Sequence, residues 1–182
     1  FISNFNERIT RKLGNSCYYL PAARSGILQG HRALFASLID ISPLAGIRKL
    51  DIPTMSGVIS DFIIKLIINL PEQKGEFSKE IEKFENEMIH GTISVTKREK
   101  HGYPEIVFLL NNKNIIPIHR ASSTVSELAP IFLHLKYYVK RGDVLIIEEP
   151  EAHLHPENQV LLAKLLVFLI RKDIRIIITT HS

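Results

Sequence analysis

The chain has little of what would mark a secreted or membrane protein. Its 182 residues include a single cysteine, Cys17, so no internal disulfide can form, which fits a reducing compartment. Its longest uncharged apolar runs fall well short of a membrane span, and no signal peptide is visible. We therefore expect a soluble protein with no membrane contact and the cytoplasm as its default location.

The chain also lacks a strong charge of either sign. The net charge is +4, and residues 1–50 hold seven Lys or Arg against two acids, a local surplus of five. Such a basic region can attract nucleic acid or nucleotide phosphates, but a modest surplus is also typical of ordinary solvated surface. The length and the hydrophobic content of 45% suit one domain, or one domain with a small lobe.

The last forty residues carry the clearest pattern. Residues 144–147 and 174–179 are continuous apolar runs without alternation, separated by a helical pattern. Uninterrupted apolar strands are typical of a parallel sheet that is covered on both faces. The stretch therefore predicts a βαβ unit.

Polar side chains follow both of these strands. Glu148 and Glu149 come directly after the first strand, and residues 179–182, which include His181, end the second. In parallel α/β sheets the ligand lies beyond the carboxyl ends of the strands. Two adjacent acids after an apolar run are costly unless they meet a cation or hydrogen-bond donors. A bound Mg²⁺ with a phosphate would meet that need.

Near the N-terminus, residues 17–20 predict a short strand that runs into Pro21, and residues 22–26 predict a turn that leads into a helix over 27–41. A charged helix is also expected over 5–14. Arg24 stands at the junction of strand and helix. Its guanidinium could reach a phosphate or a partner's carboxylate, or it could cap local carbonyls as a surface residue. Both readings stay open here.

The middle of the chain predicts helices and then a small sheet. Two helices are expected over 57–69 and 78–90, the second capped by Ser78, with an inner face formed by Ile81, Phe84, Met88 and Ile89. We interpret this segment as a helical lobe inserted into a sheet domain. Three β segments at 92–97, 105–110 and 115–118 with turn residues between them predict an antiparallel meander.

At residue 121 the pattern returns to helix. Apolar residues recur at the three-and-four spacing of one buried face: Val125, Leu128, Ala129, Phe132, Leu135 and Val139. Thr124 with Glu127 forms a capping-box pattern, so the serine-rich start predicts a well-capped helix. Such a helix N-terminus, with free amides and hydroxyls, can equally bind phosphate. The sequence does not separate these two interpretations.

Taken in order, SSTVSEL, VLIIEEP followed by EAHLHPENQ, and IIITTHS resemble the C-terminal half of an ABC-type ATPase head. The closest likeness is to the SMC/RecF-like and OLD-like (overcoming lysogenization defect) group, and YYLPAARSG resembles a segment of that group. The resemblance implies an α/β fold of the P-loop NTPase type, with a mostly parallel sheet, an inserted helical lobe and a β meander. The chain then divides into 16–42 (strand, turn and helix), 43–91 (lobe), 92–118 (meander) and 119–182 (core).

The resemblance also implies ATP and Mg²⁺ as ligands and assigns roles to individual residues. Glu148 would hold Mg²⁺, Glu149 would orient and deprotonate the attacking water, and His181 would contact the γ-phosphate. Glu151, His153 and His155 would match the D-loop at a dimer interface. Ser122, Ser123 and Thr124 would form the signature that reaches the partner's nucleotide, although its usual glycine pair is missing. The group further implies a homodimer and work on nucleic acid, in repair, restriction or phage defence.

One motif of that group is absent. The chain contains no G-x-x-x-x-G-K-[ST], and none of its glycines is followed by lysine. In the resembled group this phosphate-binding loop precedes every motif seen here, so we expect an incomplete domain that hydrolyses ATP poorly by itself. Two alternatives remain open: a metal-dependent hydrolase that uses Glu149, His153, His155 and His181, and a non-catalytic dimerisation or DNA-binding module.

Overall fold

The computed structural model describes residues 15–30, 56–96, 105–111 and 114–181. The helix predicted over 5–14 and most of the one predicted over 27–41 lie outside these ranges. Within them, residues 24–30 are helical, three residues before the predicted start. The other elements are β1 (Cys17–Leu20), α3 (Gly57–Ile63), the π-helix η2 (Ile64–Ile68), α4 (Ser78–Ile89), β2 (Gly91–Thr96), β3 (Glu105–Leu110), β4 (Ile115–Pro117), the 3-10 helix η3 (Ile118–Arg120), α5 (Ser123–Tyr137), β5 (Val144–Glu148), α6 (Pro156–Arg171) and β6 (Arg175–Thr179).

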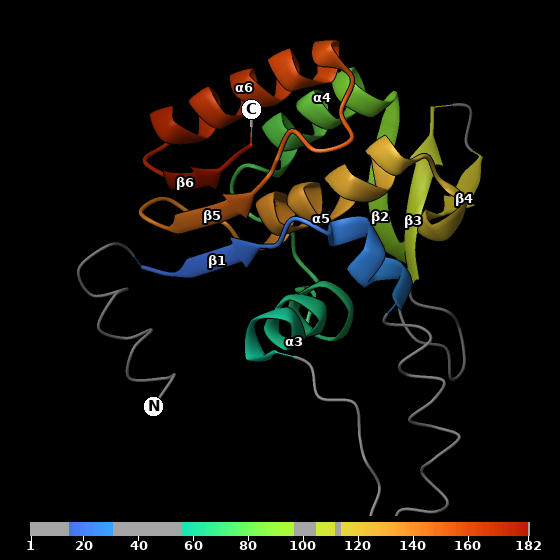
Figure 1. The fold of residues 1–182 in the computed structure, drawn as a ribbon, viewed down its shortest axis with the longest axis horizontal. Coiled ribbons are helices and arrows are strands. Elements are labelled where there is room, and N and C mark those ends of the chain that lie inside the picture. Colours follow the sequence, from blue (N-terminus) through green and yellow to red (C-terminus); the bar gives the residue numbers. More distant parts are fainter. Residues whose placement is uncertain (1–14, 31–55, 97–104, 112–113, 182) are drawn as a thin grey trace, which may run out of the picture.

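Two small sheets form the α/β fold (Figure 1). In the described residues, β1, β5 and β6 make a parallel sheet in that order, with Leu20 opposite Ile147 and Glu148 opposite Thr179. The unit β5–α6–β6 is the predicted βαβ unit. The strands β2, β3 and β4 pair antiparallel, which confirms the expected meander. The sequence thus predicted both the fold class and the strands.

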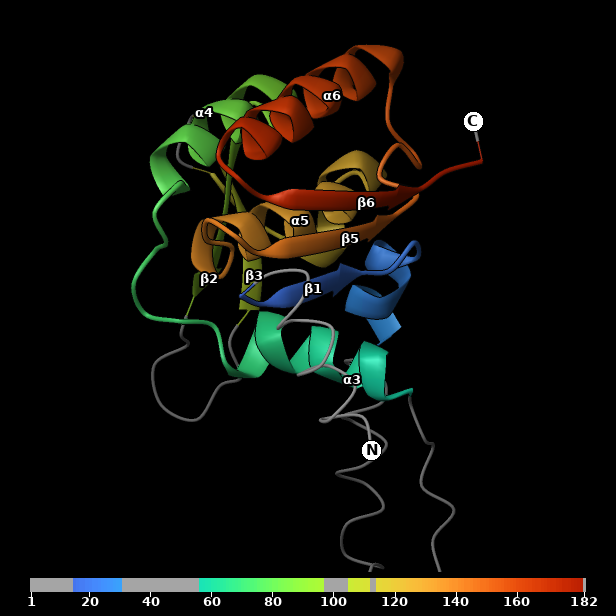
Figure 2. The same ribbon diagram turned by 90° about the vertical axis from the view of Figure 1, so that its left-hand side faces the viewer.

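The two apolar strands of the βαβ unit differ in burial. Leu145 and Ile147 of β5 are fully buried, whereas Ile177 and Ile178 of β6 are 49% and 41% exposed. β6 lies at the edge of the described sheet (Figure 2), with β5 on one side only. The expectation that both faces of both strands are covered is therefore wrong for β6 in the described part of the chain.

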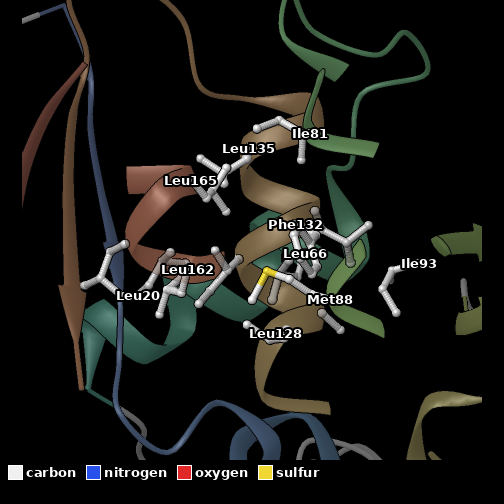
Figure 3. Close-up of a cluster of buried hydrophobic side chains, with 14 of the residues drawn as sticks. Leu20, Leu66, Ile81, Met88, Ile93, Leu128, Phe132, Leu135, Leu162 and Leu165 are labelled. Carbon is white, nitrogen blue, oxygen red and sulfur yellow. The ribbon is translucent and has the colours of Figure 1, made fainter. Parts of the chain in front are cut away.

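Helix α5 lies between the two sheets and is the centre of the core. Every residue from 125 to 136 is buried, so the helix has no solvated face, although the spacing had predicted a single apolar face. Figure 3 shows Leu128, Phe132 and Leu135 of α5 between Leu20 on the side of the parallel sheet and Ile93 on the side of the meander. Because α4 and η2 also contact α5, each side of the helix meets another element.

The remaining helices cover this core from two directions (Figures 1 and 2). α4 packs against α5 and α6, and α3 contacts β1 at the opposite end of the parallel sheet. Ile81, Met88 and Ile89 of α4 are buried as predicted. Ser78 is the first residue of α4 and not its cap, because Phe77 holds the N-cap position. None of the described helices combines the length and the apolar character needed to cross a membrane.

A buried ion pair joins α4, α5 and β2. Lys136 Nζ lies 2.9 Å from both carboxylate oxygens of Glu85 and donates to the Ile93 carbonyl at 2.5 Å. The Ile93 amide donates to Glu85 Oε1 at 2.6 Å. The two side chains are 1% and 0% exposed. Burial raises the pKa of Glu85 and lowers that of Lys136, while each charge shifts the other's pKa in the opposite direction. The pair fixes the meander to the helices.

Candidate functional site

The parallel strands deliver polar side chains to one edge of the sheet, as the sequence predicts. In Figure 2 the arrows of β5 and β6 point the same way, and the C-terminus lies beyond the end of β6. There His181 Nε2 lies 2.7 Å from Glu149 Oε1, with the side chains 86% and 34% exposed. The structure thus brings together the two residues to which the sequence analysis assigned catalytic roles. Both remain in reach of solvent.

The backbone of Glu149 is held in an unusual conformation. Its φ is +41°, in the left-handed region that non-glycine residues rarely adopt. Its amide donates to the Thr179 carbonyl at 2.8 Å, which extends the pairing of β5 and β6 beyond the strands. Non-glycine residues in this region persist where the surrounding structure holds them, and they are frequent at functional sites. The turn therefore directs the Glu149 side chain away from the line of β5 and toward His181.

Glu148 points toward β1. Its Oε2 accepts a hydrogen bond from the Ala22 amide at 3.3 Å. Burial and a hydrogen bond with the Glu148 carboxylate raise the pKa of Tyr19 to about 12, so the Tyr19 hydroxyl stays protonated as a donor. The Glu148 side chain is only half-buried. A half-buried carboxylate of this kind, oriented by two donors, suits Mg²⁺, which takes few protein ligands when phosphates supply the others.

The turn after Glu149 is compact and is hydrogen-bonded to the residues that follow both β5 and β6. Ala152 donates to the Glu149 carbonyl at 3.0 Å, and the Thr180 hydroxyl donates to the Glu151 carboxylate. Burial alone would raise the pKa of Glu151, but the bonds from Thr180 and the backbone, together with the nearby His181, lower it overall. His153 has a φ of +61° and is exposed. The segment predicted as a D-loop is thus an ordered turn beside the strand ends.

The start of α5 meets this turn. The Thr124 hydroxyl donates to the His153 carbonyl at 3.2 Å. Ser122 is the N-cap of α5 and accepts from the Val125 amide, and both Ser122 and Ser123 are exposed. The predicted capping box of Thr124 with Glu127 is wrong, because Glu127 is turned into the core. His155, also exposed, is the N-cap residue of α6.

Arg24 occupies a different place from the predicted one. Its side chain is 0% exposed, and its N–H groups donate to four backbone carbonyls, those of Pro21, Glu127, Glu148 and Glu149. It also lies 3.4 Å from the Glu127 carboxylate. The guanidinium therefore faces the interior and not a phosphate, which corrects the expected contact with nucleotide. It caps local carbonyls, as the alternative reading proposed, but from within the core.

Three contributors to this region were not found from the sequence: the Glu127 carboxylate, the Tyr19 hydroxyl and the Ala22 amide. Tyr19 lies in β1, which pairs with β5, and Ala22 lies in the turn that follows β1. Only the strand order could therefore have placed them next to Glu148. Glu127 directly precedes the apolar run of residues 128–133, and a charge at the start of such a run was the available signal.

The residues proposed for a metal-dependent hydrolase do not assemble. Among the described residues, no group of three or more His, Cys, Asp or Glu side chains could hold a metal ion. Glu149 and His181 form a pair, whereas His153 and His155 are both exposed on the turn and at the start of α6. The structure gives this alternative no support.

Comparison with protein families identifies one match. The family model described as AAA ATPase domain matches residues 34–182, which include α5, both strands of the βαβ unit and the polar residues at their ends. A search of curated proteins returned no match to the chain.

Proposed function

Because the chain belongs to the AAA ATPase domain family, which indicates ATP binding and hydrolysis on a P-loop NTPase-like fold, we propose that the ends of β5 and β6 form the hydrolytic site. The observation that carries this proposal is the 2.7 Å contact between Glu149 and His181, made by neighbouring parallel strands at their carboxyl ends. Both residues follow strands within the matched segment.

In this site each residue has a distinct task. The Glu149 carboxylate accepts a proton from the attacking water and orients it, a role that needs a partly exposed acid in a fixed direction. With a proton on both ring nitrogens, His181 pairs with that carboxylate through Nε2 and donates from Nδ1 to a terminal phosphate oxygen. Glu148, whose carboxylate is only half-buried, would hold the cation. When bound, Mg²⁺ would neutralise charge on the phosphates of ATP. Arg24 stabilises the backbone and has no direct contact with nucleotide in this scheme.

The exposed start of α5 is suited to contact with a second copy of the chain. Ser122 and Ser123 face solvent at a helix N-terminus, and Thr124 bonds the adjacent turn that carries Glu151 and His153. We propose that this combined surface, with His155, contacts the nucleotide and the turn of a second copy, in an ABC-type dimer that closes on ATP. Hydroxyls and free amides at a helix N-terminus suit a phosphate.

We make three finer proposals. The first is that the chain belongs to the SMC/RecF-like and OLD-like branch and serves a nucleic-acid process such as repair, restriction or phage defence. The second is that the domain divides into a strand, turn and helix (16–42), a helical lobe (43–91), a β meander (92–118) and a core (119–182). The third concerns the activity of these residues by themselves. Residues 1–182 contain no G-x-x-x-x-G-K-[ST] and hydrolyse ATP poorly by themselves. The motifs quoted in the sequence analysis support the first of these, and the separate helices and meander support the second.

The decisive experiment replaces Glu149 by glutamine in the protein produced from its complete reading frame. Glu149→Gln keeps the shape and removes the base, so we expect kcat for ATP hydrolysis to fall by about 100-fold or more, with ATP affinity retained. Phosphate release and binding of a fluorescent ATP analogue measure the two quantities.

The matched control is Glu87→Gln, an exposed carboxylate on α4, which should leave kcat unchanged. Equal activity of wild type and Glu149→Gln would reject the assigned role. Association that does not depend on nucleotide, with no hydrolysis in the wild type, would favour the non-catalytic dimerisation or DNA-binding module.

A further inference from the structure

Arg24 is the one described arginine with a fully buried side chain that reaches the end of β5. Nη1 donates to the Glu148 carbonyl at 2.7 Å, and Nη2 donates to the Glu149 carbonyl at 3.2 Å. Nη1 also donates to Pro21 at 2.9 Å. One rigid, planar group thus bonds two consecutive peptide units of the turn on which the proposed site is built.

Glu127 holds this arginine in place from α5. Arg24 Nε donates to the Glu127 carbonyl at 3.1 Å and lies 3.4 Å from Glu127 Oε2. The other carboxylate oxygen, Oε1, accepts from both the amide and the hydroxyl of Ser25. Oε2 is buried and has no hydrogen-bond partner, so its charge is balanced by Arg24. The pair therefore joins three segments: the helix of residues 24–30, α5, and the end of β5.

The backbone that Arg24 holds is the strained part of the site. Glu149 has a φ of +41°, and its two peptide groups are restrained from opposite sides. Its amide is bonded to the Thr179 carbonyl, and its carbonyl accepts from both the Ala152 amide and Arg24. Of these contacts, only the one from Arg24 comes from a side chain outside the turn and its neighbouring strand, and without it the left-handed conformation loses one of the bonds that oppose its relaxation.

From these contacts we propose that Arg24, held by Glu127, is a positioning residue that fixes the direction of the Glu149 side chain for hydrolysis. This inference rests on the proposed function. Arg24 acts through backbone carbonyls and does not touch ATP, because its side chain is fully enclosed. Its loss should therefore lower kcat and leave the affinity for ATP in place, since misplacing a reacting group slows the reaction without removing binding contacts.

The test uses Arg24→Lys in the protein from its complete reading frame. Lysine keeps the charge that balances Glu127, but its single ammonium cannot span two carbonyls in the fixed geometry of a guanidinium. We expect kcat to fall by about 10- to 100-fold and the KM for ATP to change by less than about threefold. In addition, the amides of Glu149 and of residues 151–154 should exchange hydrogen at least about tenfold faster without nucleotide.

Arg141→Lys is the control, because it makes the same change at an arginine that is 57% exposed and paired with Glu76. It should leave kcat, KM and exchange unchanged. Should Arg24→Lys not be recovered folded, the double variant Arg24→Gln with Glu127→Gln carries the same test, since it removes both charges together.

The outcomes separate this inference from the proposed function. A normal kcat in Arg24→Lys while Glu149→Gln is inactive would overturn the positioning role and leave the proposed function intact. A raised KM with an unchanged kcat would overturn it as well, because it would show a contact with nucleotide. If neither the wild type nor any variant hydrolyses ATP, the proposed function fails, and the exchange of residues 149–154 alone then decides whether Arg24 holds the turn.

Discussion

Two contacts between a carboxylate and a nitrogen base stand at opposite extremes of exposure in this molecule. The Glu85–Lys136 pair, between α4 and α5, is 0% and 1% exposed. The Glu149–His181 pair, at the ends of β5 and β6, is 34% and 86% exposed. Their contact distances are similar, at 2.9 Å and 2.7 Å. The difference lies in their surroundings.

The surroundings decide what each pair can do. In the core, both charged groups are also bonded to the backbone of Ile93. Removing one partner therefore leaves the other as a buried, unpaired charge without access to water. At the strand ends, either group can turn to solvent when its partner is lost. We infer that the buried pair contributes to stability and that the exposed pair is free for chemistry, and the predictions below separate these two properties.

The largest effect on stability is expected for Lys136→Met. This change keeps most of the side-chain volume but leaves Glu85 buried without a cation, so the free energy of unfolding should fall by about 3–5 kcal/mol. Urea unfolding followed by circular dichroism measures it. Hydrolysis per folded molecule should not change, because the Lys136 ammonium group, among the described residues, bonds Glu85 and the Ile93 carbonyl and not the strand ends.

Lys164→Met, at an exposed position of α6, is the matched control and should change stability little. Replacing Glu85 by glutamine in the Lys136→Met background should restore part of the loss. If Lys136→Met were as stable as the wild type, the buried pair would not be the structural element that we describe.

A somewhat smaller effect is expected from acid acting on His134. Burial lowers the pKa of this histidine to about 4, opposed by its bond to the Pro130 carbonyl, with Lys65 and Asp61 as the nearby charges. The folded protein therefore keeps His134 neutral, while the unfolded chain takes up a proton below its ordinary pKa of about 6.5. Its contribution to stability is complete above that pH, and about 3 kcal/mol is lost as the pH falls from about 6.5 to about 4.

Urea unfolding of the wild type and of His134→Phe between pH 7.5 and pH 4 tests this prediction. The variant keeps a ring to stack on Phe62, whose ring centroid lies 5.6 Å from that of His134 in the wild type. The variant should show a pH dependence weaker by about the amount given above. Identical slopes in the two proteins would show that His134 takes up its proton without unfolding.

The comparison also explains which features the sequence could predict. The strands β1, β5 and β6 were predicted because their apolar runs are local. The closeness of Glu149 and His181 was predicted because parallel strands end at one edge of the sheet. The exposure of β6 was not predicted, since the apolar residues of β5 and β6 follow a similar pattern in the sequence. Pattern indicates which strands can be buried, but not which neighbours cover them.

The buried polar groups were the main omission. Glu85 looked like part of the charged face of α4, and its partner Lys136 is 51 residues away in the chain. Glu127 looked like a capping residue of α5, while its partner Arg24 is 103 residues away. Local spacing carries no information about such distant partners, so Glu127 was given a local capping role and Glu85 none. The buried ion pairs could thus not be predicted from the sequence, although the closeness of Glu149 and His181 at one edge of the sheet could.

The smallest effect on stability, and the sharpest test of the comparison, is expected for His181→Ala. Because this side chain is 86% exposed, its removal should leave the Tm within about 1 °C of the wild type. In the proposed site the same change removes a donor to phosphate and frees Glu149, so kcat should fall by about 10- to 100-fold. Differential scanning fluorimetry and phosphate release measure the two effects, with the exposed His119→Ala as control. A drop in Tm comparable to that of Lys136→Met, or an unchanged kcat, would mean that the contact at the strand ends holds structure, as the buried pair does, and that the chemistry lies elsewhere.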